Sequence, residues 1–166
     1  MLPPPSVPQA LTQAMFRVVD IFGSLEGSLL MLDEDTQELC FEVMVGEHVA
    51  PLRPVRIPLG QGICGWVAQN GQPLLVPDVR QEPRFYAEAD LASGFETRSI
   101  LAVPIVVLGR AVGVIELLNK ADRTAFTPWD QRILMAIATL AGDAIERAAM
   151  RQELAGLRAQ SGGATS

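Results

Sequence analysis

Three short segments of the sequence carry residues whose types and spacing favour binding of a small molecule. The turn Gly60-Gln61-Gly62 leads into a predicted helix over Ile63–Gln69. Free amides and the positive dipole end at such a helix N-terminus favour an anion such as a phosphate. Further along, Ser93 and Thr97 can donate hydroxyl hydrogen bonds. Glu116 is the single charge in an otherwise apolar strand pattern. Together these residues indicate a binding pocket.

Glu116 has two interpretations. Alternation along the strand puts it on one face with Val112, Val114 and Leu118. A carboxylate buried there needs a ligand N–H or a neighbouring hydroxyl as its partner. Alternatively, Glu116 is half exposed on an edge of the sheet. The first interpretation makes it a ligand-binding residue.

Cysteine and histidine are too few to support a metal or disulfide site. Cys40 and Cys64 are the only cysteines, and His48 is the only histidine. They exclude a disulfide-dense scaffold and give no support to a metal site or a haem ligand. Cys40 and Cys64 are predicted to be small buried hydrophobic residues, and no catalytic residue is predicted.

Composition predicts one folded domain that binds neither nucleic acid nor membrane. The chain has 166 residues, of which 49% are hydrophobic and 19% charged, and this excludes a disordered chain. With 13 basic and 19 acidic residues the net charge is −6, which opposes nucleic-acid binding. The first residues lack the basic and apolar pattern expected of a signal peptide, and Pro104 interrupts the longest apolar run, at 100–108. We expect a soluble, cytoplasmic protein.

A helix is predicted near each end of the chain. Apolar residues recur at three- and four-residue steps from Gln9 to Phe22, and Gly23 is a stop signal. Thr127 is the predicted N-cap of the final helix, with Pro128 in the first turn, and this helix is expected to run to about residue 158. The predicted apolar stripe of the final helix consists of Ile133, Ile137, Leu140, Ala144 and Ala148.

The stripe on the final helix is spaced close to the 3.5-residue repeat of a coiled coil. We therefore expect a parallel homodimer through this stripe and through the Leu11–Val18 face of the first helix. The alternative is that the same stripe is buried within the monomer.

The segments between the helices are predicted to be short antiparallel strands. The ranges are 28–32 and 39–45 (a hairpin), 55–59 (an edge strand, because of its prolines), 74–76, 98–108 and 111–119, the last two joined at Gly109-Arg110. Residues 77–94 are expected to form a loop with a helical piece near 84–91. This order predicts an α+β domain over 9–158 with both terminal helices on one sheet face, a disordered proline-rich lead-in at 1–8 and a flexible tail at 159–166.

Several separate blocks of this sequence resemble the GAF domain family, the sensory modules of phosphodiesterases, cyclases, phytochromes and bacterial signalling proteins. The blocks are LGQGICGWVA (59–68), VPDV (76–79), PRFY (83–86), GFETRSILAVPI (94–105) and VGVIELLNK (112–120). The resemblance covers residues 10–150. It implies a profilin/PAS-like antiparallel sheet of about six strands, with pocket-covering helices and loops on the face opposite the terminal helices.

Four residues resemble the NKxnFx3DE signature of cyclic-nucleotide-binding GAF domains in phosphodiesterases. They are Asn119, Lys120, Phe126 and Asp130, and Gln131 stands where the signature ends in Glu. The resemblance implies that Lys120 and Asp130 form an ion pair that organises the pocket without touching ligand. From the residues alone, Asp130 can also complete a capping box with Thr127, and Phe126 is expected to pack in the core.

The resemblance also implies which residues contact a ligand. Ser28 would meet a base, the amides of Ile63 and Cys64 would face a phosphate, Tyr86, Asp90, Ser93 and Thr97 would form the lid and pocket, and Glu116 would line the floor. Where that subgroup has an aromatic residue followed by Asp, this chain has Met44-Val45. The missing ring removes about 1 kcal/mol of stacking on the base.

The sequence therefore predicts a non-catalytic sensory domain that needs no cofactor and binds a small anionic ligand, foremost a cyclic nucleotide (cAMP or cGMP). It would signal through a helical dimer interface. One alternative is a ligand-free GAF scaffold for dimerisation or partner docking. Another is a free methionine sulfoxide reductase of the GAF fold, but that enzyme's nucleophile lies in a cysteine cluster, and residues 78–119 contain no cysteine.

Overall fold

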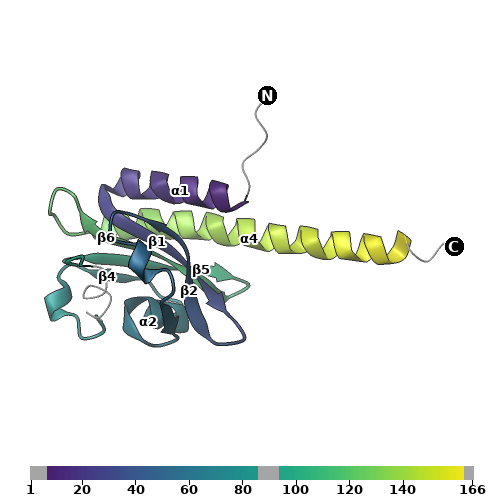
Figure 1. Cartoon of the computed structure of the whole chain (residues 1–166), viewed down its shortest axis with the longest axis horizontal. Coiled ribbons are helices and arrows are strands. Elements are labelled where there is room, and N and C mark those ends of the chain that lie inside the picture. Colours follow the sequence, from purple (N-terminus) through teal and green to yellow (C-terminus); the bar gives the residue numbers. More distant parts are fainter. Residues whose placement is uncertain (1–6, 86–93, 163–166) are drawn as a thin grey trace, which may run out of the picture.

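The computed structural model describes residues 7–85 and 94–162 (Figure 1). The chain alternates helices with antiparallel strands, and two short 3-10 turns (η1 and η2) follow β2 and β4. The elements are α1 (Val7–Phe22), β1 (Ser24–Asp33), β2 (Glu38–Val45), η1 (Ala50–Leu52), β3 (Arg56–Pro58), α2 (Gly62–Asn70), β4 (Leu74–Val76), η2 (Val79–Gln81), β5 (Ile100–Val107), β6 (Arg110–Lys120) and α4 (Pro128–Gly162).

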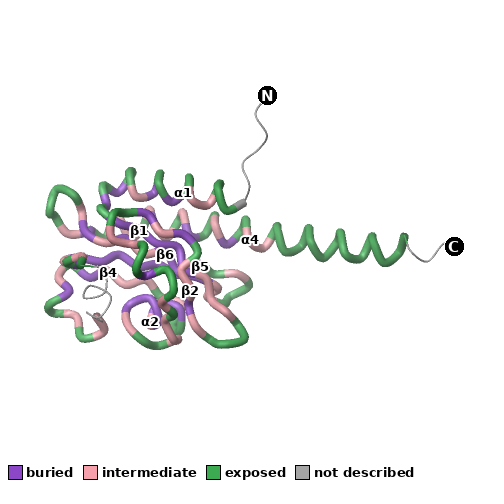
Figure 2. The backbone as a smooth tube through the Cα atoms, in the orientation of Figure 1, coloured by how far each residue is buried: buried purple, intermediate pink, exposed green. Residues whose placement is uncertain are grey.

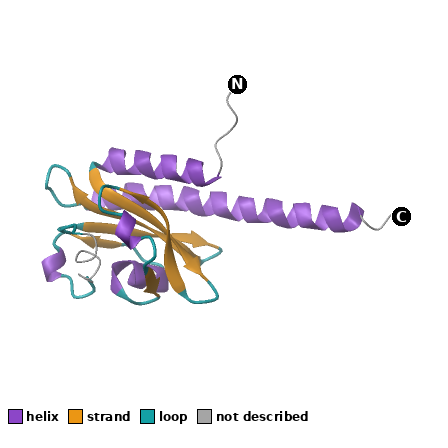
Figure 3. Ribbon diagram, viewed as in Figure 1, coloured by secondary structure: helices purple, strands orange, loops and turns teal. Residues whose placement is uncertain are grey.

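The strands form one six-stranded sheet in the order β3-β2-β1-β6-β5-β4, and every neighbouring pair is antiparallel. Helices α1 and α4 cover one face of this sheet and α2 covers the other (Figure 3). The α+β class, the strand number and the placement of both terminal helices on one face are thus confirmed. β3 lies at an edge, as its proline requires.

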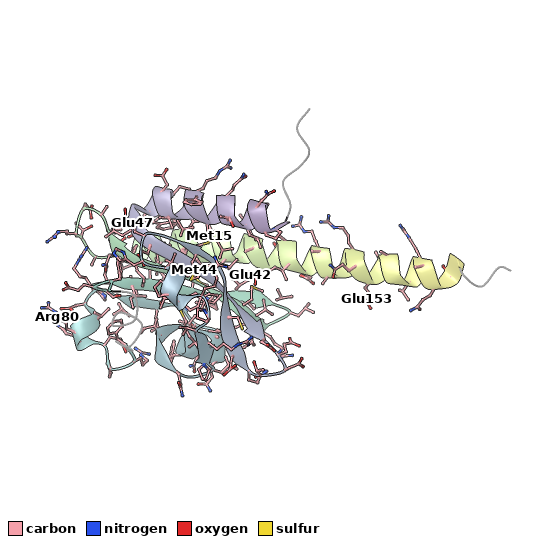
Figure 4. The ribbon with its side chains drawn as sticks, in the orientation of Figure 1. Met15, Glu42, Met44, Glu47, Arg80 and Glu153 are labelled. Atoms are coloured by element: carbon pink, nitrogen blue, oxygen red, sulfur yellow. The ribbon has the colours of Figure 1, made fainter. Side chains whose placement is uncertain are left out.

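The larger core cluster fills the space between the sheet and the two terminal helices. Met15 and Val18 of α1 and Leu134 and Ala138 of α4 are buried in it (Figure 4 labels Met15). Phe126 joins the same cluster, as expected, at 2% exposure. Gly142 allows α4 to approach β5 closely, because a Cβ at this position would collide with the carbonyl oxygen of Val106.

A second core cluster lies on the opposite face, under α2. Ile63, Cys64 and Val67 of α2 pack there against Val114 of β6 and Leu30 of β1. Helix α2 ends at Gly71, which has the left-handed conformation expected of a glycine stop. The two clusters separate three layers: the terminal helices, the sheet and α2. The second cluster is what holds α2 against the sheet.

The β5–β6 hairpin differs in two details from the predicted one. The two turn residues are Leu108 and Gly109, both with positive φ, rather than Gly109 and Arg110. The pairing also slips by one residue between Ile105 and Val106. Because a one-residue slip reverses which face a side chain occupies, Val112 packs on the α1/α4 side and not beside Glu116.

Both terminal helices are longer than predicted. α1 begins at Val7, inside the predicted lead-in, because Pro8 is tolerated in a first helical turn. α4 continues to Gly162, so residues 159–162 are helical and not part of a tail. Nothing between Arg158 and Ser161 breaks a helix. The predicted helical piece near 84–91 falls largely outside the described residues.

The predicted apolar stripe of α4 is only partly buried in the monomer, because Ile133 and Ile137 pack against the core cluster but the rest of the stripe does not. The buried residues are Leu134, Ala138 and Gly142, whereas Leu140 is 67% exposed. Ala144 and Ala148 are exposed too. The helix therefore has two apolar faces, and the periodicity alone did not tell which one meets the sheet. The Leu11–Val18 face of α1, which was predicted to contact a second copy, packs instead against the core cluster of the monomer.

Candidate functional site

A cavity of about 280 Å³ lies between the sheet and α2. This volume is near the lower end of the range for small-molecule sites. The wall is mostly apolar. Arg56 and Gln61 line it beside α2, and four further polar side chains converge on it from β1, from β6 and from the segment that precedes β5. These four residues are Glu26, Ser28, Thr97 and Glu116.

Five of the eight predicted ligand-contacting residues line this one cavity. They are Ser28, Ile63, Cys64, Thr97 and Glu116. The sheet register explains part of the convergence, because Ser28 on β1 pairs with Glu116 on β6. The remaining three, Tyr86, Asp90 and Ser93, lie outside the described residues.

Glu116 is half-buried on a central strand, between β1 and β5, so the edge-strand alternative is wrong. Its carboxylate accepts a hydrogen bond from the buried thiol of Cys64. Burial raises the pKa of that thiol well above its usual range, and the Glu116 carboxylate raises it further. At neutral pH, Cys64 is therefore a protonated thiol that helps to position Glu116, as expected of a buried cysteine rather than a nucleophile.

The N-terminus of α2 forms the opposite wall. Gly60 and Gly62 both have positive φ, and Gln61 between them is extended and makes no side-chain capping bond to the helix. The first turn, with Ile63 and Cys64, borders the cavity. The glycine turn thus directs the start of α2 at the cavity, as predicted, and this end of a helix favours negative charge.

Glu26 is a cavity residue that sequence reasoning missed. Its side chain is 4% exposed, and Oε1 accepts a hydrogen bond from the backbone N–H of His48 at 3.0 Å and lies 3.1 Å from Nδ1 of the same residue. The His48 ring in turn contacts Phe95, another cavity residue, at 5.5 Å between ring centroids. Strand β1 was predicted to begin at Ser28. Alternation from Ser24 onward would have put Glu26 on the same face as Ser28.

The Met44-Val45 pair lies outside this cavity. Val45 is buried in the α1/α4 core cluster, and Met44 pairs with Ser28 across β1 and β2. The described wall instead takes its aromatic surface from Phe41, Phe85 and Phe95.

Asn119 ties the segment that carries Thr97 to the end of β6. Its side-chain Oδ1 accepts hydrogen bonds from the backbone N–H groups of Arg98 (2.7 Å) and Ser99 (3.1 Å), and Nδ2 donates to the carbonyl oxygen of Glu96 (2.8 Å). Asn119 is 1% exposed and has a φ of +52°, a conformation that asparagine tolerates better than most residues.

The next residue links the sheet to α4. Lys120 Nζ lies 2.9 Å from Oδ2 of Asp130, which is the ion pair that the resemblance implied. Asp130 also accepts a hydrogen bond from the backbone N–H of Thr127, and the Thr127 hydroxyl accepts one from the N–H of Asp130. Both interpretations of Asp130 are therefore correct, because a capping box and an ion pair share one carboxylate.

This arrangement makes the stability of the domain depend on pH. Burial raises the pKa of Asp130, but hydrogen bonds from Lys120 and Thr127 outweigh it, so the pKa lies below its ordinary value. A lowered carboxyl pKa stabilises the fold above its unfolded value of about 4, and this contribution is lost as pH falls through the folded value. Urea unfolding of the wild type and Asp130→Asn should differ by roughly 1–2 kcal/mol at pH 7, and the difference should shrink progressively as the pH is lowered below about 4. A difference that is constant over this range would contradict the assignment.

The described residues offer no metal centre and no membrane span. Within 7–85 and 94–162, no group of three histidine, cysteine or acidic side chains is placed to hold a metal ion. No helix in the same ranges combines the length and the apolar character that crossing a bilayer requires.

The sequence profile of the GAF domain family matches residues 6–145, and the chain belongs to this family. One relative is a dual 3',5'-cyclic-AMP and -GMP phosphodiesterase 11A of Takifugu rubripes, 35% identical over 113 residues. The match covers 65% of this chain but only 12% of that phosphodiesterase. The chain thus corresponds to a small part of the larger protein.

Solved structures support the fold. The GAF domain of a phosphoenolpyruvate-protein phosphotransferase from Coxiella burnetii superposes with a TM-score of 0.75 at 20% identity, covering 89% of this chain and 88% of that one. A free methionine-R-sulfoxide reductase from Neisseria meningitidis, solved with its substrate, superposes at 0.72 with 26% identity, covering 88% and 80%. The same fold therefore occurs as a domain of a phosphotransferase and in a sulfoxide reductase.

Proposed function

We propose that this chain is a regulatory GAF domain whose cavity binds a small anionic ligand, with a cyclic nucleotide as the first candidate. The observation that carries this proposal is the convergence of Ser28, Thr97 and Glu116 on a cavity whose opposite wall is the N-terminus of α2. The likeness to a domain of a cyclic-nucleotide phosphodiesterase supports the same candidate.

The two walls of the cavity favour different ends of such a ligand. The first turn of α2 is suited to the phosphate, with amides and a positive dipole end. Arg56, which also lines the cavity, adds a positive charge that Asp33 and Glu38 partly neutralise. The sheet wall carries the carboxylates of Glu26 and Glu116, which accept hydrogen bonds and therefore favour the N–H groups of a purine. A molecule that is anionic at one end and rich in N–H donors at the other fits both.

We propose further that the domain is not a sulfoxide reductase. Cys64 is the one cysteine on the cavity, and its pKa is raised by burial and by Glu116, whereas a reductase nucleophile must be a thiolate. The second free cysteine, Cys40, lies on β2 and does not line the cavity. We further propose a cytoplasmic location, where both free thiols stay reduced.

Ligand occupancy would be transmitted to α4 over a short path. Thr97 touches the cavity, Asn119 holds the backbone on both sides of Thr97, and Lys120 pairs with Asp130 in the first turn of α4. A ligand that favours one arrangement of these contacts changes the position of α4 only if its affinity for the two states differs. The second copy of the chain, through α4, is the proposed receiver.

Thermal unfolding with cAMP and cGMP tests the proposal, with 5'-AMP and 5'-GMP as matched linear nucleotides. A ligand at about 100 times its dissociation constant adds roughly 2.7 kcal/mol, or about 5–10 °C in Tm for a domain of this size. We expect such a shift with a cyclic nucleotide and a smaller one with its linear counterpart. If neither cyclic nucleotide shifts Tm at millimolar concentration, the alternative of a ligand-free dimerisation or docking scaffold replaces this proposal.

A further inference from the structure

The chain between β2 and β3, residues 46–55, forms a further wall of the cavity and is called the wall segment below. Val49, Leu52 and Val55 line the cavity from this side. Leu52 is the one buried residue of the wall segment, and the tube of Figure 2 is exposed over much of it. The N–H groups of Leu52 and Val55 donate to carbonyl oxygens three residues back within the segment itself. A largely exposed segment with such local bonds keeps its shape only if something anchors it to the sheet.

A buried carboxylate near the start of β1 provides this anchor. Oε1 of Glu26 accepts a hydrogen bond from the backbone N–H of His48, which belongs to the wall segment, at 3.0 Å. Nδ1 of the His48 ring lies 3.1 Å from the same oxygen. The side chain of Glu26 is 4% exposed, and a carboxylate buried to this degree is costly without hydrogen-bond donors. Moving His48 away from Glu26 therefore carries a penalty.

The first residue of the wall segment is a glycine that fits closely around the same carboxylate. The pairing of β2 with β1 ends at Val45, opposite Gly27, and Gly46 follows with a φ of +144°, a conformation that favours glycine. A Cβ at Gly46 would lie 2.6 Å from Cγ of Glu26, so only glycine lets the chain pass this close to the side chain. This close passage and the donors of His48 are two separate features that both converge on Glu26.

The His48 ring also connects the wall segment with the chain that precedes β5. Its centroid lies 5.5 Å from that of the Phe95 ring, and the two planes are tilted by 46°. Phe95 lines the cavity, and so does Thr97 two residues further on. Asn119 fixes the backbone around Thr97 through its hydrogen bonds. His48 therefore lies where two walls of the cavity meet, and Glu26 holds it there.

We propose that Glu26 is a positioning residue of the cavity, which through His48 holds residues 46–55 in place as a wall around the ligand. Without this hold the wall segment is loose before a ligand arrives, and the ligand must order it on binding, which lowers the affinity. The effect on affinity rests on the proposed function. The hold of Glu26 on the wall segment is a property of the domain without a ligand, so the two are tested separately.

The protonation of the His48 ring tests the link to Glu26. His48 is the only histidine of the chain, so the protein without a histidine tag gives the signals of one imidazole in a long-range ¹H–¹⁵N spectrum. This spectrum distinguishes which ring nitrogen carries a proton, and donation to Glu26 requires the proton on Nδ1. We expect a protonated Nδ1 in the wild type and a change toward the Nε2–H tautomer in Glu26→Ala. A wild-type ring protonated at Nε2 alone would overturn the proposal.

Amide hydrogen exchange followed by mass spectrometry tests the hold on the wall segment. In His48→Ala the amides of residues 46–55 should exchange roughly 3- to 10-fold faster than in the wild type, and in Glu26→Ala faster still, while α4 keeps its rates. His48→Asn offers an amide donor close to the position of Nδ1 and should restore the slow rates. Glu42→Ala is the matched control, because Glu42 is an exposed glutamate on β2 that does not line the cavity. Exchange over 46–55 that is equal in His48→Ala and the wild type would overturn the proposal.

Titration with cAMP and cGMP then tests the effect on affinity. His48 does not line the cavity, so a loss in His48→Ala is not the loss of a ligand contact. We expect roughly 3- to 10-fold weaker binding in His48→Ala, mainly through faster dissociation, and recovery in His48→Asn. Equal affinities of His48→Ala and the wild type would overturn the positioning role and leave the proposed function intact. If neither nucleotide binds the wild type, the proposed function fails, and the spectrum and the exchange rates still decide whether Glu26 holds the wall segment.

Discussion

Asn119→Ala is expected to lower the free energy of unfolding by about 3 kcal/mol or more, which is roughly 6–12 °C in Tm. The change removes three hydrogen bonds to the backbone of residues 96, 98 and 99. It leaves the buried N–H of Ser99 and the half-buried N–H of Arg98 without a partner, and it puts alanine at a positive φ. Since Thr97 lies within this segment, the affinity for a cavity ligand should fall as well. Urea unfolding monitored by circular dichroism measures the stability.

Two variants separate the causes. Asn119→Gly avoids the positive-φ strain but does not restore the lost hydrogen bonds. Relative to Asn119→Ala, it should therefore recover about 1 kcal/mol at most. Asn70→Ala is the matched control, because its side chain makes one exposed hydrogen bond, to the carbonyl of Trp66. It should cost less than about 1 kcal/mol. Equal losses in Asn119→Ala and Asn70→Ala would show that Asn119 does not hold the 96–99 segment.

Glu116→Gln is expected to weaken binding of a cyclic nucleotide by roughly 10- to 100-fold with little change in stability. A hydrogen bond to a charged acceptor contributes about 1.5–3 kcal/mol, and the glutamine keeps the size of the side chain while losing the charge. The Cys64 thiol retains an oxygen to donate to, so the packing under α2 is preserved. Isothermal titration calorimetry measures the affinity, and the thermal midpoint without ligand reports on the fold.

Glu42→Gln is the matched control for this change. Glu42 is exposed on β2, at the position where the pairing with β1 slips, and it does not line the cavity. Its replacement also removes one negative charge, so any effect of net charge on an anionic ligand appears in both variants. If Glu116→Gln and Glu42→Gln bind the nucleotide equally well, Glu116 is not a ligand-binding residue.

Local signals in the sequence predicted most of the fold. The glycine stops at Gly23 and Gly71, the capping box of Thr127 and Asp130, and the apolar strand runs each depend on neighbouring residues only, and all are present. Features that depend on pairing between residues far apart in the sequence could not be predicted from local signals. The slip that turns Val112 to the helix side depends on how β5 meets β6, and no residue within β6 encodes it.

The site followed the same division. Ser28, Ile63, Cys64, Thr97 and Glu116 were found because their blocks resemble a known family, and the sheet brings them together. Glu26 was missed because the start of β1 was set four residues late, and a buried glutamate has no periodic signal of its own. The α4 stripe was only partly correct: Ile133 and Ile137 pack against the core, but hydrophobic periodicity does not tell that Leu134 and Ala138 are the residues buried on the sheet.

A crystal structure of the protein grown with a saturating cyclic nucleotide tests the central claim most directly. The proposed function predicts the nucleotide in the cavity between the sheet and α2, with phosphate oxygens about 3 Å from the first-turn amides of α2 and purine N–H groups at the Glu116 carboxylate. An empty cavity under these conditions, or a nucleotide bound on another surface of the domain, would contradict it.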